Sequence, residues 1–201
     1  MNEHQLQIIT EVKNVVTDII QHEVSPYFVF HNIYHTKDVA SSVEKLAGHH
    51  QLCDVDEFIL FVSAWFHDTG FSMGRVEGHE EESIKLATQF LNQHKADTEI
   101  INRVSACIQA TSMPQTPKHI LEQIICDADL YHLGTDAYLE WSNLLKQELV
   151  NYNKNDISDE KWRQENIGFL RGHRFCTVHA QQNLEPVKQG WIKHLELIVT
   201  V

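Results

Sequence analysis

Apolar residues along the chain recur mostly at intervals of three and four rather than two, which is the spacing of amphipathic helices. In the first segment, for example, Leu6, Ile9, Val12 and Val16 fall on one stripe. The pattern predicts an all-α fold of about eight to nine helices. The expected helices cover residues 3–24, 34–50, 55–68, 79–95, 97–111, 117–134, 135–152, 158–171 and 177–197.

Breaks between these segments are short and carry recognisable turn residues. Ser25-Pro26 ends the first helix, because the residue before a proline is pushed out of the helical region. Residues 69–78, TGFSMGRVEG, are expected to form a loop, and TSMPQTP is a second break in which Pro117 suits the first turn of the next helix. No internal repeat or low-complexity tract divides the chain. We therefore expect one compact helical domain over residues 1–201.

Composition narrows the possible functions. The chain of 201 residues has a net charge of −12, which argues against binding a nucleic-acid polymer. A small nucleotide is still possible, because a bound cation reverses the local field. The four cysteines are far apart and suit reduced thiols, and no apolar run approaches the length of a bilayer span. The start of the chain lacks the profile of a signal peptide. We expect a cytoplasmic protein without a membrane segment.

Four candidate ligands lie on apolar helix faces near helix ends. His35 precedes apolar residues by four, eight and eleven positions, whereas Asp68 and Asp129 each follow apolar residues at helical spacing. His67 lies about 100° around the helix from Asp68. Ordinary hydrogen bonds explain any one of these residues, but an inward aspartate is rare unless it is paired or metal-bound. Two imidazoles and two carboxylates suit a divalent transition metal.

The segments YHTKDV, WFHDTGF and ICDADL, in this order, resemble the signature of the HD-domain superfamily of metal-dependent phosphohydrolases. The resemblance implies a compact all-α fold in which His35, His67, Asp68 and Asp129 bind a divalent metal ion. Manganese, iron, cobalt, nickel, zinc and magnesium all occur among such proteins. The implied function is cleavage of a phosphoester or phosphoanhydride bond of a small nucleotide-like substrate by a metal-activated water. A homo-oligomer is compatible with this picture.

Residues after the His-Asp doublet are candidates for catalysis and substrate binding. His79 and Glu80 lie within the apolar arc of the helix that begins there, whereas Glu81 faces away from it. We therefore expect His79 and Glu80 to act in acid-base chemistry. Arg75, in the loop directly after the doublet, and Lys118 are the expected cationic contacts for substrate phosphate.

The chain also departs from patterns known in the superfamily. Two-metal members carry further histidines, and His79 suits one of these positions, but Thr111 stands near the position of the other. His119 fits the start of a surface helix better than a ligand position. Some single-metal members carry a glutamate where Phe71 and Ser72 stand here. We therefore expect one metal ion. The alternatives are a non-catalytic nucleotide-sensing module and, less favoured, a di-iron oxygenase.

Two features remain open between a functional and a structural role. Asp127 could orient a ligand histidine through its second nitrogen, or it could cap local backbone. The aromatic residues Tyr27, Phe28, Phe30 and Tyr34 could stack on a nucleobase, although aromatic residues at this spacing more often pack in a core.

Overall fold

The structure is a computed structural model that describes residues 3–198. Within this range the regular structure consists of ten α-helices and two short 3-10 helices, without strands, so the predicted all-α class is confirmed. The elements are α1 (Glu3–His22), α2 (Ile33–Ala47), α3 (Asp54–Phe66), η1 (Thr69–Met73), α4 (His79–Gln93), α5 (Thr98–Ala110), α6 (Ile120–Asp129), η2 (Tyr131–Gly134), α7 (Tyr138–Asn153), α8 (Asp159–Gly172), α9 (Val178–Asn183) and α10 (Glu185–Leu197).

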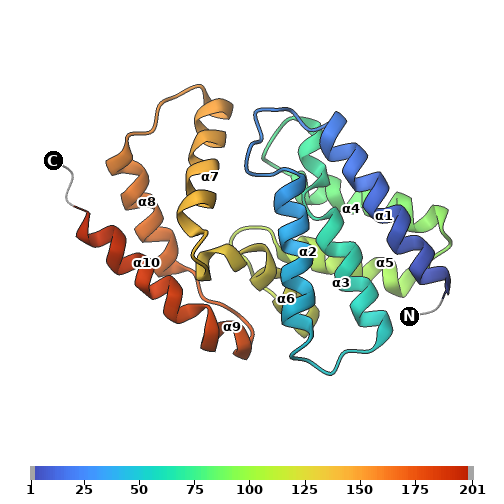
Figure 1. The fold of residues 1–201 in the computed structure, drawn as a ribbon. Helices are drawn as coiled ribbons and strands as arrows, with labels where there is room; N and C mark the ends of the chain where they lie inside the picture. Colours follow the sequence, from blue (N-terminus) through green and yellow to red (C-terminus); the bar gives the residue numbers. More distant parts are fainter. Residues whose placement is uncertain (1–2, 199–201) are drawn as a thin grey trace.

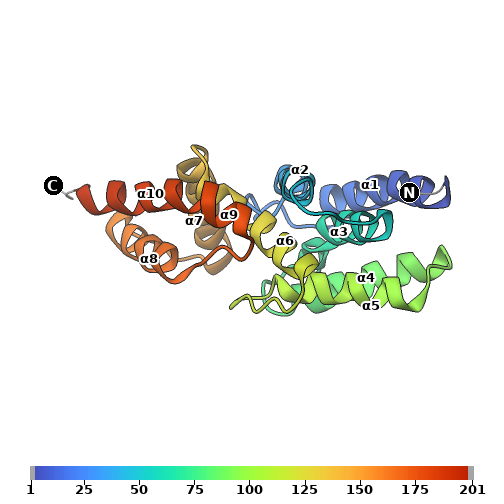
Figure 2. The same ribbon diagram turned by 90° about the horizontal axis from the view of Figure 1, so that it is seen from below.

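The helices form two groups that lie side by side (Figure 1). Helices α1 to α6 pack together in one group, in which α3 contacts α2, α5 and α6 around the apolar core. Helices α7 to α10 form the second, smaller group (Figure 2), and η2 contacts both α6 and the second group. The chain therefore passes from one group to the other immediately after α6.

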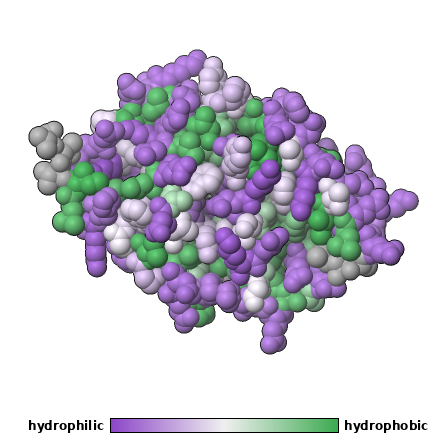
Figure 3. Space-filling model, in the orientation of Figure 1, coloured by the Kyte–Doolittle hydropathy of each residue, from purple (hydrophilic) through white to green (hydrophobic). Residues whose placement is uncertain are grey.

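Polar side chains cover much of the face shown in Figure 3, with hydrophobic residues scattered among them. This distribution agrees with the acidic composition of the chain, whose net charge is −12. Each helix in residues 3–198 is too short or too polar to cross a lipid bilayer.

Two helix ends place residues of the predicted metal site. Asn32 caps α2, because its side-chain oxygen accepts the backbone N–H groups of Tyr34 and His35 at 2.7 and 3.3 Å. This cap fixes His35 in the first turn of α2. Helix α3 ends at Phe66, and His67 follows at its C-cap, so the His-Asp doublet lies where the chain leaves the helix.

The structure corrects several predicted boundaries. The single helix expected at residues 177–197 is two helices, α9 and α10, because Pro186 lacks an N–H group and lies in the first turn of a new helix. The helix expected from Pro117 begins at Ile120 and ends at Asp129, and a 3-10 turn follows it. The first half of the expected loop 69–78 forms η1.

Gly70 allows the 3-10 helix η1 to lie directly against the start of α4. A Cβ atom at position 70 would lie 1.9 Å from the carbonyl oxygen of His79, which is far inside van der Waals contact. The backbone N–H of Gly70 donates to the hydroxyl of Ser83 at 2.8 Å. The glycine after the His-Asp doublet is therefore required because the backbone of α4 occupies the space beside it.

We predict that Gly70→Ala destabilises the protein by at least about 1–3 kcal/mol, because backbone atoms of α4 would have to move. Thermal or urea unfolding measures this change. Gly190→Ala is the matched control, since a Cβ atom there meets nothing within 4 Å and alanine is the better helix former. Equal stability of the two variants would contradict the close contact.

Candidate metal centre

The four predicted ligands come from three helices and meet at one point. His35 lies in the first turn of α2, His67 and Asp68 follow α3, and Asp129 ends α6. His35 and His67 are almost completely buried, Asp68 is 6% exposed, and the side chain of Asp129 is 17% exposed. The site is therefore closed on the protein side and reaches the surface through Asp129.

The donor atoms lie within a few ångströms of one another. Nε2 of His35 lies 3.3 Å from Oδ2 of Asp68 and 3.3 Å from Oδ1 of Asp129. Nε2 of His67 lies 3.0 Å from Oδ2 of Asp68 and 3.5 Å from Oδ1 of Asp129. Donor atoms of His35, His67 and Asp129 all lie within 4.8 Å of one another, close enough to share one ion.

Three of these polar atoms are buried without a hydrogen-bond partner: Nε2 of His35, Nε2 of His67 and Oδ2 of Asp68. Unpaired buried polar atoms are rare in folded proteins, because leaving such an atom without a partner costs about 1–3 kcal/mol. A cation placed among them would satisfy all three. The imidazoles of His35 and His67 and the carboxylate of Asp129 therefore fit a divalent metal ion, and Asp68 lies beside this group of three, with its Oδ2 3.0 Å from Nε2 of His67.

Backbone contacts fix the orientation of His67. Its Nδ1 lies 2.9 Å from the carbonyl oxygen of Ala64, and because a carbonyl can only accept, Nδ1 carries a hydrogen. The Nε2 atom, which faces Asp68 and Asp129, is therefore left to bind a cation or a proton.

The four side chains also change one another's affinity for protons. Burial alone would lower the pKa of His35, but the nearby carboxylates of Asp129 and Asp68 favour its charged form and raise the pKa to about 9. Burial opposes a charge on His67 too, yet attraction by Asp68 raises its pKa well above the ordinary value. Burial would raise the pKa of both aspartates, but the imidazoles hold each below its usual value. Without a metal ion, the site holds protons in its place.

Residues 32–134, just over half of the chain, match the family model described as HD domain. The chain belongs to the HD domain family. This match confirms the resemblance stated on sequence motifs, and it covers the segment that carries the four converging side chains. No curated protein and no solved structure matches the chain.

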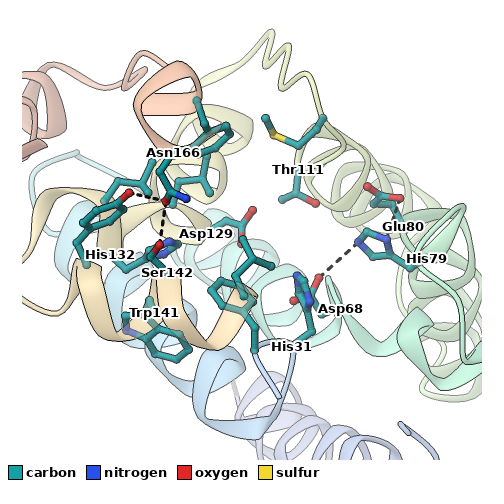
Figure 4. A pocket seen from close by; sticks show the side chains of 17 residues that line it. His31, Asp68, His79, Glu80, Thr111, Asp129, His132, Trp141, Ser142 and Asn166 are labelled. Atoms are coloured by element: carbon teal, nitrogen blue, oxygen red, sulfur yellow. Dashed lines mark hydrogen bonds and ion pairs between the residues drawn. The ribbon is translucent and has the colours of Figure 1, made fainter. Parts of the chain in front are cut away.

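The HD segment places His79 and Glu80 next to the ligand cluster, at the start of α4. Nδ1 of His79 donates to the carbonyl oxygen of Val76 at 2.7 Å, so its Nε2 faces Asp68 Oδ1 at 3.6 Å. A carboxylate oxygen of Glu80 lies 3.4 Å from Nδ1 of His79. Both residues line a cavity that also exposes Asp68 and Asp129 (Figure 4).

The other residues singled out in the sequence differ in their position relative to this cavity. Arg75 and Lys118 are exposed, and neither lines this cavity. His119 is exposed at the N-cap of α6, as expected for the start of a surface helix. Thr111 lines the cavity, and its hydroxyl donates to the carbonyl oxygen of Ile108. Phe71 is buried, with its ring stacked between the rings of two histidines.

Asp127 and the aromatic residues before His35 have structural contacts. The carboxylate of Asp127 accepts the backbone N–H groups of Cys176 and Thr177, both at 2.7 Å, so it caps backbone rather than orienting a histidine. Tyr27 and Tyr34 are exposed, whereas Phe28 and Phe30 are buried. Among these four aromatic residues, Phe30 lines the cavity.

The partly exposed His31 and the buried Glu148 form a pair that the sequence patterns did not indicate. Glu148, on α7, is 2% exposed and accepts the backbone N–H groups of Phe30 and His31 at 2.8 and 3.0 Å. Its second oxygen contacts Nδ1 of His31 at 2.5 Å. The ring of His31 stacks on Phe71 and lines the cavity beside Asp68. Because 117 residues separate the two side chains, no local pattern in the sequence connects them.

We predict that His67→Ala and Asp129→Ala each lower the metal content of the purified protein by at least about tenfold, because each removes a donor of the cluster. Elemental analysis after dialysis against limiting metal measures this. His119→Ala is the matched control and should retain the wild-type content. Wild-type metal content in both cluster variants would exclude the site.

We also predict that the stabilisation by added metal increases between pH 6.5 and about 9. The raised pKa of His35 stabilises the metal-free fold fully below the unfolded value of 6.5, and this contribution is lost as the pH rises through about 9. Over the same range protons compete less with the metal, by about tenfold in affinity per pH unit for each proton displaced. The difference in melting temperature with and without Ni²⁺ measures this, and a difference that shrinks with rising pH contradicts it.

Proposed function

We propose that the protein is a metal-dependent phosphohydrolase that cleaves a phosphoester or phosphoanhydride bond of a small nucleotide-like substrate. The observation that supports this most is the cluster of buried donor atoms without partners, which opens through Asp68 and Asp129 into a cavity. Membership in the HD domain family agrees with metal-dependent hydrolysis. A divalent ion, when bound, supplies an activated water and offsets negative charge on the phosphoryl oxygens.

The residues beside the cluster suit the transfer of protons. Glu80 and His79 line the same cavity as Asp68, and Glu80 lies within 3.4 Å of the His79 ring. A carboxylate at this position is able to accept a proton from a water held near the cluster or to return one to the leaving group. We assign proton transfer to Glu80 and the orientation of Asp68 to His79.

Arg75 and Lys118 are proposed to meet a negatively charged substrate outside the cavity, because both side chains are exposed and neither lines it. Such contacts steer an anion toward a site more than they stabilise its bound form. A cytoplasmic location and assembly as a homo-oligomer are predictions that rest on the sequence alone.

The two rival functions receive less support. A nucleotide-sensing module would not require donor atoms that reach a cavity next to Glu80. For a di-iron oxygenase, the described residues offer one group of three or more donors close enough to share an ion, and Thr111 stands where a further imidazole was expected.

We predict that the purified protein releases phosphate from small phosphoesters or phosphoanhydrides when Mn²⁺ or Co²⁺ is added, and that a chelator abolishes the release. Glu80→Gln should lower kcat by about 10²–10⁴-fold without changing the metal content, because it removes proton transfer but not a proposed ligand. Colorimetric phosphate release over a substrate panel measures both effects.

The neighbouring Glu81→Gln provides the matched control, since Glu81 is exposed on the same helix turn and does not line the cavity. Tight binding of nucleotides without turnover at any metal tested would favour the sensing module. Oxygen uptake by the iron-loaded protein would favour the oxygenase.

A further inference from the structure

The cavity beside the ligand cluster has two chemically different ends. Asp68, His79 and Glu80 lie at one end, and Ser142 and Asn166 lie at the other, with Asp129 between them (Figure 4). The first end belongs to the HD segment, whereas the second is formed by α7 and α8, outside residues 32–134. The helices beyond the HD segment therefore shape the part of the cavity away from the cluster.

The second end is mainly apolar. Its wall includes Trp141 and Leu145 of α7 and Phe169 of α8. The cavity has a volume of about 230 Å³, whereas pockets for drug-sized ligands span roughly 300–1,000 Å³. A molecule with one small ring or a short apolar chain therefore fits better than an extended one.

The polar groups at this end already bind one another. The hydroxyls of Tyr138 and Ser142 donate to Oδ1 of Asn166 at 2.6 and 2.8 Å, and Nδ2 of Asn166 donates to the carbonyl oxygen of Trp162. The indole N–H of Trp162 in turn donates to Ser142. A ligand gains few hydrogen bonds here, because these groups would have to break existing ones.

Cationic side chains do not line the cavity. Among its lining residues, all within the described part of the chain, there is neither lysine nor arginine, and three are carboxylates: Asp68, Glu80 and Asp129. A phosphate that enters such a site without a cationic partner carries a high desolvation cost. A cation at the cluster would offset the negative charge of one phosphoryl group, but a second or third phosphoryl group would have no cationic partner.

At the cluster end, His31 supplies a group for the phosphoryl oxygens. Its Nδ1 is held by the buried carboxylate of Glu148, so Nε2 is the ring nitrogen left for a ligand. Stacking on Phe71 limits rotation of the His31 ring, so less conformational entropy is lost when a ligand binds to it.

We infer that the cavity accepts a molecule with a single phosphoryl group joined to an uncharged, largely apolar organic group. The phosphoryl group lies between the ligand cluster and His31, and the organic group lies against Leu145 and Phe169. This inference rests on the phosphohydrolase part of the proposed function, because the bond to be cleaved joins these two parts, and it replaces the nucleotide-like substrate with a less polar phosphomonoester. Phosphomonoesters with an aromatic or aliphatic group are thus preferred over nucleoside triphosphates and inorganic polyphosphates.

Binding of stable phosphonates to the Mn²⁺-loaded protein tests the inference without turnover. By titration calorimetry, phenylphosphonate should bind at least about tenfold more tightly than methylphosphonate, because its ring is removed from water. It should also bind at least about tenfold more tightly than 4-phosphonobenzoate, which carries a carboxylate into the apolar end.

Variants at the two ends should have different effects. Phe169→Ala and Leu145→Ala should remove most of the preference for phenylphosphonate while leaving methylphosphonate binding unchanged. His31→Gln should weaken both phosphonates alike. Leu139→Ala is the matched control, since Leu139 lies on α7 at 36% exposure and does not line the cavity.

Equal affinity for the three phosphonates, or a phenyl preference that persists in both apolar variants, would overturn the inference. The inference would also be overturned if none of the three phosphonates bound to the metal-loaded protein. These outcomes are separate from failure of the proposed function. A protein that prefers phenylphosphonate but releases no phosphate keeps the cavity assignment and loses the hydrolase. A protein that hydrolyses polyphosphates without a phenyl preference keeps the hydrolase and loses this inference.

Discussion

The site depends on the need for positive charge among four side chains, of which three are buried and Asp129 is partly exposed. Nε2 of His35 and Nε2 of His67 face the carboxylates of Asp68 and Asp129 in a region that water scarcely reaches. Two carboxylates so placed repel each other unless a cation lies between them. Protons meet this need in the metal-free protein, as the raised pKa of His35 indicates. A divalent ion would meet the same need, because His35, His67 and Asp129 are close enough to share one.

The rest of the fold holds these donors in place by contacts that are individually ordinary. The Asn32 cap fixes the first turn of α2, and Gly70 lets η1 pack directly against α4. Two buried carboxylates join the helix groups: Asp127 binds backbone before α9, and Glu148 binds backbone before α2. Both carboxylates accept pairs of backbone N–H groups, which compensates their burial. The cluster and the far wall of the cavity are therefore fixed relative to each other.

Local features of the sequence were enough to predict the all-α class and the four side chains that lie close together, but they were not enough to predict contacts between distant segments. Apolar spacing indicates the helices, and the ordered motifs indicate His35, His67, Asp68 and Asp129, whose donors the structure brings together. The division of the last helix followed from a local signal, Pro186, that the apolar pattern alone did not reveal. The His31–Glu148 pair had no such signal, because burial of a glutamate depends on how α7 packs.

The acidic net charge of the chain does not conflict with the proposed binding of an anion, because most of that charge lies far from the cavity or is screened by salt. The net charge of −12 is spread over the chain, and salt screens exposed charges beyond about 8–10 Å. Inside the cavity the effective dielectric constant is lower, so an ion at the cluster dominates the local field. That field decays toward α7 and α8, where apolar side chains and a closed hydrogen-bond network replace charge. This gradient supports the inference that the cavity accepts one phosphoryl group at the cluster and no second one farther along.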